Sequence, residues 1–188
     1  MVSAVREPRK ISLSSSSYVL RTLETRDDCT AWCKWLEDPE TARLLNTQPV
    51  KLSPDDFVRY VQGFDHVNDH LLGIFRRDTN VMAGLWAIYI DWQHSYFLLN
   101  LIIGDREDRN KGARLATADL VHRYFFEEMG LLSARCTAVA SNEQIQRILE
   151  KKQWRLERRD SKPSVLGEGS VEILTYSLPR DVWRRRPR

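Results

Sequence analysis

The sequence predicts a single α/β domain with one mixed, mostly antiparallel sheet of about seven strands and helices on both of its faces. Three observations lead to this fold class. Segments with the two-residue period of strands alternate with segments whose apolar residues recur at helical spacing. Three strand-like segments between residues 71 and 103 are joined by short turns, which favours antiparallel pairing. Hydrophobic residues make up 42% of the 188-residue chain, enough for one sizeable core.

The first third of the chain is expected to hold a leader, one strand and a set of helices. Residues 1–17 are polar and end in four serines, so we predict a flexible leader. Residues 18–23 alternate in polarity and predict the first strand. Helix start signals follow, with Asp or Ser as the cap and Pro at the first helical position in two of them; they lie at Asp27–Asp28, Asp38–Pro39 and Ser53–Pro54.

The rest of the chain predicts six more strands and two helices. The strands are expected over 71–77, 81–91, 96–103, 132–139, 154–158 and 171–178. One helix is expected over 113–129, where apolar residues line one face and Gly130 supplies a stop. Ser141 and Asn142 supply a cap for the other helix, which continues to about residue 153. A Gly- and Pro-containing loop is expected over 162–170.

The basic turn over 104–112, which joins a strand to a helix, is the clearest functional signal. The first amides of a helix have no acceptors within the helix, and the helix dipole adds to their attraction for a phosphate. Arg109, Lys111 and Arg114 would add positive charge around the same point, next to Gly112. This order predicts a nucleotide or coenzyme A site. The alternative is an ordinary connection with a solvated basic rim.

Charge, cysteines and hydropathy exclude several classes of protein. The net charge of +3 is too small to argue for nucleic-acid binding. The three cysteines lack the spacing of a disulfide framework or a zinc site, so we expect reduced thiols, no metal and a cytoplasmic location. The longest apolar run is too short to span a membrane. The basic tail over 184–188 either contacts an acidic surface or, as is more common, is a solvated end.

The basic turn resembles the phosphate-binding signature of the GNAT acyltransferase superfamily, whose members move an acyl group from acyl-CoA to an amine. That signature, Gln/Arg-x-x-Gly-x-Gly/Ala, reads here Arg109-Asn110-Lys111-Gly112-Ala113-Arg114. The last position departs from the pattern, because Arg114 stands where Gly or Ala is usual. Its side chain would either crowd the pyrophosphate or swing outward and bind it.

Other segments are similar to the RimJ/RimL-like branch of the superfamily. They are W-L-x-D-P-E at Trp35–Glu40, W-x-H at Trp92–His94, I-G-D at Ile103–Asp105, and a closing L-x-R-x-x-W at Leu178–Trp183. The likeness extends from about Tyr18 to Trp183. It therefore implies a single acyl-CoA N-acyltransferase domain over 18–183, with a mixed sheet that splays open between its two central strands.

The resemblance implies where acetyl-CoA binds. In this superfamily a backbone amide at the opening between the two central strands holds the thioester carbonyl, which places it near Leu101, Ile102 and Ile103. The phosphates would rest on the amides of Asn110 to Arg114. Asn142 would face the pantetheine arm and could at the same time be a plain helix cap.

The groups that transfer protons are harder to assign. Many relatives carry a Glu on the strand over 96–103, but the matching position is Leu98 and that strand contains no carboxylate. Asn100 shares the face of Leu98 and would orient the amine or a water, although an amide cannot accept a proton. His94 lies three residues after Asp91, and an unperturbed histidine has a suitable pKa for a base; the alternative is a structural turn histidine.

The usual acid for the leaving thiolate, a Tyr, is replaced by Leu149. Solvent can protonate a thiolate because thiol pKa values lie near neutrality. Positioning of the reactants alone can lower a barrier by about 7–11 kcal/mol. A base that contributes about 10²- to 10⁴-fold could therefore be absent from a slower but working catalyst.

We therefore expect an N-acetyltransferase that uses acetyl-CoA and acts on a primary amine, with an amino sugar or sugar nucleotide as the favoured acceptor. Specificity would come from residues 32–63 and the loop over 162–170. The aromatic side chains of Trp32, Trp35, Trp86 and Trp92 would either stack on a sugar or fill the core. Two alternatives remain: acetylation of protein N-termini, and a degenerate CoA-binding domain, which the losses at Leu98 and Leu149 suggest. A homodimer is consistent with the resemblance.

Overall fold

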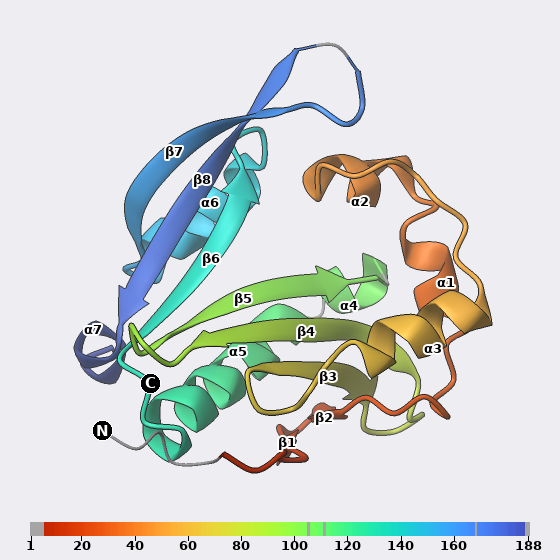
Figure 1. Cartoon of the computed structure of the whole chain (residues 1–188), viewed down its shortest axis with the longest axis horizontal. Helices are drawn as coiled ribbons and strands as arrows, with labels where there is room; N and C mark the ends of the chain where they lie inside the picture. The colour runs from red at the N-terminus through yellow and green to blue at the C-terminus, as the bar shows by residue number, and fades with distance from the viewer. Residues whose placement is uncertain (1–5, 105, 111, 168, 187–188) are drawn as a thin grey trace.

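The computed structural model of the chain describes residues 6–104, 106–110, 112–167 and 169–186 (Figure 1). One eight-stranded sheet has the order β1-β2-β3-β4-β5-β6-β8-β7. Its strands are β1 (Ser12–Ser14), β2 (Tyr18–Thr22), β3 (Asp69–Arg76), β4 (Met82–Asp91), β5 (Tyr96–Ile103), β6 (Ser133–Val139), β7 (Arg155–Pro163) and β8 (Ser170–Pro179). All neighbours are antiparallel except β5 and β6, which are parallel.

The prediction of a mixed, mostly antiparallel sheet is confirmed, but the count of about seven strands was one too few. The additional strand is β1, which lies within residues 1–17 and pairs with β2 through Ser12↔Arg21 and Leu13↔Leu20. Three residues are too few to show the two-residue period of a strand, so β1 can be identified only from its pairing with β2. Strand β7 also extends to Pro163, well past the expected end at residue 158, because β8 pairs with it along that length.

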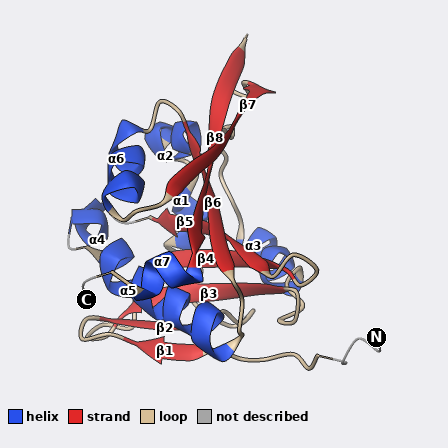
Figure 2. Ribbon diagram, turned by 90° about the vertical axis from the view of Figure 1, so that its left-hand side faces the viewer, coloured by secondary structure: helices blue, strands red, loops and turns tan. Residues whose placement is uncertain are grey.

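Helices cover both faces of the sheet, as the sequence predicted. They are α1 (Trp32–Trp35), α2 (Pro39–Leu44), α3 (Pro54–Gln62), α4 (Arg106–Asn110), α5 (Ala113–Arg123), α6 (Glu143–Lys151) and α7 (Arg180–Arg184), with a π-helix η1 (Tyr124–Glu128) that continues α5. Figure 2 shows α4, α5 and α6 on one side of the sheet and α3 on the other. In the described residues, no helix is long and apolar enough to cross a membrane.

The start signals act as expected at three of these helices. The Asp38 side chain accepts a hydrogen bond from the Thr41 amide at the start of α2. Ser53 and Asp56 form a reciprocal capping box at the start of α3. The Asn142 side chain caps α6 by accepting from the Ile145 amide at 3.2 Å. These local bonds fix where the helices begin before any packing contact is considered.

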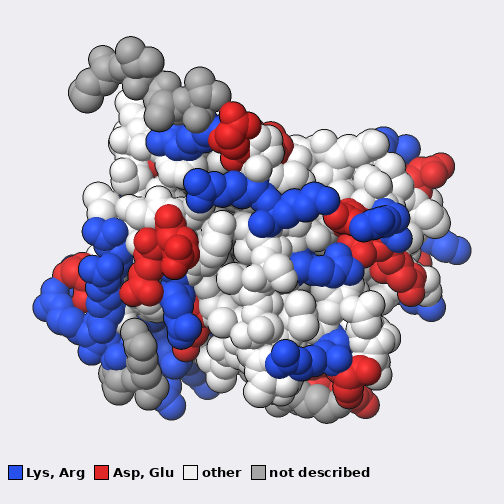
Figure 3. Space-filling model, turned by 90° about the horizontal axis from the view of Figure 1, so that it is seen from below, with Lys and Arg blue, Asp and Glu red and all other residues white. Residues whose placement is uncertain are grey.

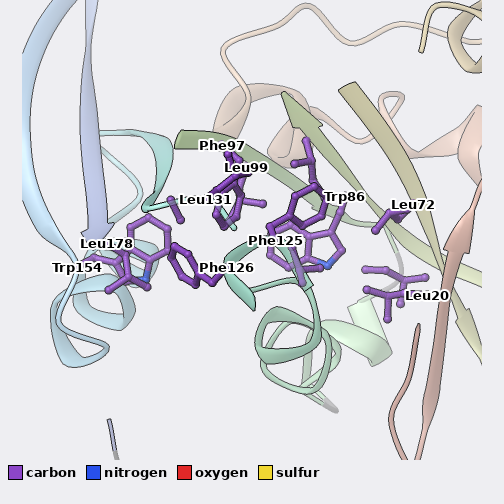
Figure 4. Close-up of a cluster of buried hydrophobic side chains, with 14 of the residues drawn as sticks. Leu20, Leu72, Trp86, Phe97, Leu99, Phe125, Phe126, Leu131, Trp154 and Leu178 are labelled. Atoms are coloured by element: carbon purple, nitrogen blue, oxygen red, sulfur yellow. The ribbon is translucent and has the colours of Figure 1, made fainter. Parts of the chain in front are cut away.

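Strand alternation divides the core between the two faces. On the α5 face Trp86 and Phe97 pack against Phe125 and Phe126 of η1, and the Phe97 and Phe125 rings stack at 5.2 Å between centroids (Figure 4). On the α3 face a second cluster joins the helices to β3 and β4; its members include Trp32, Trp35, Phe57, Leu71 and Leu85. The sheet is thus held firmly on both sides at the end where η1 and α3 pack.

The sheet opens between β5 and β6. Pairing between them runs only from Tyr96↔Ser133 to Leu99↔Cys136, although β5 continues to Ile103. Each strand keeps its other neighbour over the same stretch, with Gly84↔Ile103 in β4–β5 and Val139↔Ile173 in β6–β8. Figure 1 shows β5 and β6 together at their starts and far apart at their ends. This split is the feature that positions the site.

Charge on the surface is mixed. Figure 3 shows acidic side chains beside many of the basic ones on the face seen from below. Ion pairs of this kind include Lys10–Glu24 at 2.6 Å and Arg159–Glu172 at 2.9 Å. Pairing of this kind limits the long-range field of a chain whose net charge is only +3.

Candidate active site

Two cavities meet at the split between β5 and β6. The α5-side cavity has a volume of about 380 Å³, and its lining includes Trp86, Leu99 and residues of α5 and α6. The α3-side cavity has a volume of about 320 Å³, and its lining includes Tyr60 and Asn100. Because neighbouring strand residues point to opposite faces, these linings place the cavities on opposite sides of the sheet. Both are also lined by four shared residues: Leu44, Leu45, Leu101 and Ile102.

The N-terminus of α5 opens onto free space. Gly112 occupies the N-cap position with φ of 77° and ψ of 24°, a left-handed conformation that favours glycine. A Cβ atom built on Gly112 would meet no described atom within 4 Å. No side chain in the described part of the chain caps this helix start. The first amides of an 11-residue helix are therefore available to an anion, which is the geometry that the basic turn predicted.

Helix α4 is anchored to the sheet by Asp108, whose relative exposure is only 1%. Its carboxylate accepts from the Tyr18 hydroxyl at 2.8 Å and pairs with the Arg76 guanidinium at 2.6 Å. These contacts tie α4 to β2 and β3. Breaking a buried charge pair by removing one partner typically costs about 3–5 kcal/mol, so the turn ahead of α5 rests on a firm base.

Arg109 has protein partners in this structure. Its Nε donates to the Ile103 carbonyl at 2.7 Å, and its Nη2 donates to the Thr41 hydroxyl at 2.9 Å and the Gly104 carbonyl at 3.3 Å. It therefore joins the end of β5 to α2 across the α5-side cavity. A direct contact between Arg109 and a phosphate stays a prediction from the sequence.

Hydrogen-bond parity decides which β5 amides face the split. The Gly104 amide donates to the Ala83 carbonyl of β4 at 3.0 Å. Donors on an antiparallel strand alternate in direction, so the Ile102 amide also points toward β4. The amides of Leu101 and Ile103 then point away from β4 and into the split, and the Ile103 carbonyl, which reaches Arg109, has the same direction. Leu101 is the first such residue after pairing with β6 ends at Leu99.

The structure brings most of the predicted cofactor-binding residues together. Six of them line the α5-side cavity: Leu101, Ile102, Ile103, Arg109, Arg114 and Asn142. Ala113 is fully buried as the first residue of α5, and Asn110 ends α4. Lys111 lies outside the described residues. Leu149, which stands at the position of the usual Tyr, also lines this cavity.

The two residues predicted to be catalytic lie far apart. Asn100 is exposed and lines the α3-side cavity, beside the split. His94 lies in the turn between β4 and β5, where its Nδ1 is 2.9 Å from Asp91. That turn is at the Tyr96 end of β5, opposite to the end that opens, and His94 is in the lining of neither cavity. The structure does not bring His94 to the other site residues.

Electrostatics differ between the cavities. Burial lowers the pKa of Arg114 and raises the pKa of the Cys136 thiol to about 12, so at neutral pH the first stays charged and the second stays neutral. Burial also raises the pKa of Tyr60 and of Tyr89, whose hydroxyls remain neutral donors. The α5-side cavity therefore has fixed positive charge, and the α3-side cavity has neutral polar groups.

Several lining residues were not among those that the sequence predicted to bind the cofactor. Thr41 was expected only as part of a helix, yet it is buried and accepts from Arg109. Trp86 was expected either to stack on a sugar or to fill the core, and its Nε1 donates to the Thr117 hydroxyl of α5 at 3.0 Å. Arg186 was expected in a solvated tail, yet it lines the α5-side cavity. A helix start or a basic tail does not reveal which distant element it contacts.

A family model described as an acetyltransferase (GNAT) domain matches residues 18–153. The chain belongs to the GNAT family. It is an acetyl-CoA-dependent N-acetyltransferase, as the resemblance in its sequence implied. The match covers β5, β6, the basic turn, α5 and α6, which supply most of the lining of the α5-side cavity.

Solved structures share this GNAT fold at low identity. A GNAT-family acetyltransferase from Bacillus anthracis is 16% identical with a TM-score of 0.75, and covers 91% of this chain and 99% of its own. A spermidine N-acetyltransferase from Vibrio cholerae in complex with CoA and spermine is 15% identical with a TM-score of 0.78, covering 91% of this chain and 100% of its own. At such identities the likeness shows the fold alone. A search of curated proteins found no match.

Proposed function

We propose that this GNAT enzyme acetylates the primary amine of a neutral, hydroxyl-rich acceptor, of the class of amino sugars and sugar nucleotides. Acetyl-CoA would occupy the α5-side cavity and the acceptor the α3-side cavity. The observation that carries the proposal is the meeting of the two cavities at Leu101 and Ile102. Two substrates that enter from opposite faces of the sheet would come together at this point.

The donor would be held mostly by backbone groups. The amides at the start of α5, after Gly112, suit the diphosphate, and Arg114 adds charge to the same cavity. Asn142 would reach the pantetheine arm with the side-chain NH₂ that its capping oxygen leaves available. The Leu101 amide would donate to the thioester carbonyl oxygen as negative charge develops there. One such donor typically contributes about 10²- to 10³-fold to turnover.

The acceptor class follows from the neutral lining of the α3-side cavity. Its polar groups come from Tyr60, Tyr89, Asn100 and Thr137, and no carboxylate occurs among the described residues that line it. Hydroxyl and amide groups of this kind exchange hydrogen bonds with sugar hydroxyls, and tyrosine rings offer an apolar surface to a sugar. A polyamine would need carboxylates to offset its charge, so this lining argues against such an acceptor.

Transfer requires that the amine nitrogen bond to the acetyl carbon while the carbon–sulfur bond breaks. The leaving thiolate gains a proton and the nitrogen loses one, in each case by exchange with solvent or a nearby group. Asn100 would orient the amine through its carbonyl oxygen at the mouth of the split. His94 remains the base predicted from the sequence, and the pH–rate profile of a His94→Ala variant would test that role.

The alternative acceptor is a protein N-terminus. A structure from Vibrio cholerae, described as that of a ribosomal-protein-serine acetyltransferase, is 17% identical with a TM-score of 0.70 and covers 93% of this chain and 99% of its own. The apolar residues Val139 and Ile173 in the α3-side cavity would suit the side chain of a peptide. The two acceptor classes differ in the groups next to the amine, which makes them separable by assay.

Release of free thiol from acetyl-CoA, measured with a panel of amines, tests the proposal. We expect amino sugars or sugar nucleotides to give a kcat/KM at least about tenfold above that of N-terminal peptides and of spermidine, equivalent to about 1.4 kcal/mol. Preference for peptides would establish the alternative, and preference for spermidine would refute the argument from the neutral lining. Binding of CoA without turnover on any amine would indicate a degenerate domain.

A further inference from the structure

Arg186 lies in the α5-side cavity although it is near the end of the chain. The C-terminal segment reaches this position because α7 packs beside the α5–η1 helix, where the Trp183 and Phe126 rings lie 5.2 Å apart between centroids. Figures 1 and 2 both show α7 next to α5. The Arg180 guanidinium holds the start of α7 through the Phe126 carbonyl at 3.4 Å. The Arg186 amide then donates to the Trp183 carbonyl at 3.3 Å, which turns the chain after α7.

The Arg186 guanidinium has N–H groups that find no hydrogen-bond acceptor in the described part of the protein. Its Nε and Nη2 atoms are buried and have no hydrogen-bond partner there. Leaving buried donors without acceptors is costly, and more so when the group is charged. An arginine fork of this kind is best satisfied by a carboxylate or a phosphate that can take two parallel hydrogen bonds.

The surroundings leave this positive charge only partly compensated. Burial lowers the pKa of Arg186, and attraction to Asp119 of α5 opposes that effect, so the group stays charged at neutral pH. Burial lowers the pKa of the neighbouring His122 to about 3, which makes that ring neutral. Lys152, at the end of α6, lines the same cavity from the other side. Two cations thus flank the space between α5 and α6, with Asp119 as the nearby carboxylate.

This position is separate from the anion site at the start of α5. Asp119 and His122 follow Gly112 by seven and ten residues, and a rise of about 1.5 Å per residue puts them about 10–15 Å along the helix. An anion at Arg186 would therefore be a second one, in the same cavity. Coenzyme A carries two anionic groups of this kind: the diphosphate, and a phosphate monoester on carbon 3 of its ribose.

We propose that Arg186 binds the ribose 3′-phosphate of coenzyme A, with Lys152 as an auxiliary cation. This inference rests on the proposed placement of the donor in the α5-side cavity. The C-terminal segment then has a binding role, because it supplies a contact to coenzyme A from outside the matched region 18–153. The guanidinium fork would take two of the phosphate oxygens, and its buried donors would gain the acceptors that they lack in the free protein.

Calorimetric titration with coenzyme A and with 3′-dephospho-coenzyme A tests this assignment. The two ligands differ only in the phosphate monoester. We expect the wild-type protein to prefer coenzyme A by about 10- to 100-fold, the range for a hydrogen bond to a charged group. Arg186→Gln should remove most of that preference by weakening coenzyme A alone, and leave the dephospho form within about twofold. Arg185→Gln is the matched control, because Arg185 is exposed and pairs with Asp181 on the surface of α7.

Three results of this titration would contradict the proposal, and each identifies which part of it is wrong. Equal affinity of the wild-type protein for both ligands would overturn the assignment while leaving the donor site intact. An equal loss for both ligands in Arg186→Gln, with unchanged thermal unfolding, would also overturn it and would point to the diphosphate. Failure of the wild-type protein to bind either ligand would overturn the placement of the donor itself.

Discussion

The two cavities at the split differ in how they are built. The α5-side cavity is bordered by elements that are locked by buried charge and backbone contacts, such as the Asp108–Arg76 pair and the Arg109 contacts to β5. The α3-side cavity is bordered by side chains of the sheet face and by Tyr60 of α3, with neutral polar groups. The α5-side cavity thus offers positive charge on a well-anchored frame, and the α3-side cavity offers neutral hydrogen-bonding groups.

This difference indicates which parts of specificity belong to the fold and which to this chain. Backbone amides and a helix start can hold a diphosphate whatever side chains surround them, so we expect the proposed donor site to tolerate departures such as Arg114 and Leu149. A neutral cavity draws its selectivity from the positions of a few side chains. Substitutions on the α5 side are therefore expected to have large effects, and substitutions on the α3 side modest ones.

The largest effect on coenzyme A binding is expected for Gly112→Trp. A side chain there would project into the open space in front of the α5 amides and exclude the phosphates. Affinity for coenzyme A, measured by calorimetry, should fall by about 100-fold or more, equivalent to about 2.7 kcal/mol. Gly130→Trp is the matched control, because Gly130 has the same left-handed φ of 76° and equally open surroundings away from the cavity. Equal losses in the two variants would attribute the effect to backbone strain.

Leu101→Pro should reduce turnover while leaving coenzyme A bound. Proline removes the amide that points into the split, and β4 does not lose a hydrogen bond because that amide points away from it. We expect kcat to fall by about 10²- to 10³-fold. Ile103→Pro removes an amide with the same direction two residues farther on, and should have a smaller effect on kcat. Normal turnover by a folded Leu101→Pro protein would contradict the role proposed for this amide.

The α5 face should also make stability depend on pH. Burial lowers the pKa of His70 to about 4 and that of His122 to about 3, whereas an unfolded histidine titrates near pH 6.5. Between pH 6.5 and 4 the unfolded chain binds more protons than the folded one, so the free energy of unfolding falls as pH falls. Each histidine contributes a slope of at most about 1.4 kcal/mol per pH unit.

Urea unfolding at pH 7 and at pH 5 measures this slope. His122→Phe should flatten it, because the phenyl ring keeps the stacking against Phe126 and cannot take up a proton. A slope that persists in a His70→Phe, His122→Phe double variant would show that other groups govern the pH dependence.

Changes on the α3 side should be modest and confined to the acceptor. Asn100→Ala and Tyr60→Phe each remove one neutral hydrogen-bonding group from this cavity. A neutral hydrogen bond contributes about 0.5–1.5 kcal/mol, so KM for the acceptor should rise about 2- to 10-fold with KM for acetyl-CoA unchanged. An effect on acetyl-CoA alone would break the assignment of the two cavities to the two substrates.

The smallest effect on activity is expected for His94→Ala. The sequence suggested His94 as the base, and loss of a general base would lower kcat by about 10²- to 10⁴-fold. Its position in the β4–β5 turn, bonded to Asp91 and away from both cavities, leads us to expect a change of less than about twofold, well below that range. A pH–rate profile that loses its acidic limb in His94→Ala would instead establish the role inferred from sequence.

The sequence by itself determined the features that depend on near neighbours in the chain. The caps at Asp38, Ser53 and Asn142 act within three residues, so local hydrogen bonding predicts them. The start of α5 after Gly112 is equally local, because one left-handed residue decides it. Alternation along β4 and β5 likewise assigned side chains to faces of the sheet before any contact between strands was known.

Only the tertiary structure decided how far the β5–β6 pairing extends and what lies across it. The split depends on where β5 and β6, which have 29 residues between them, stop pairing, and no local pattern encodes that point. The contact of Arg109 with Thr41 and the entry of Arg186 into the α5-side cavity likewise join segments far apart in sequence. Arginine side chains are long and can reach many different acceptors. Their residue type therefore predicts a preference for anions and oxygen acceptors, but packing alone decides which oxygen atoms they contact.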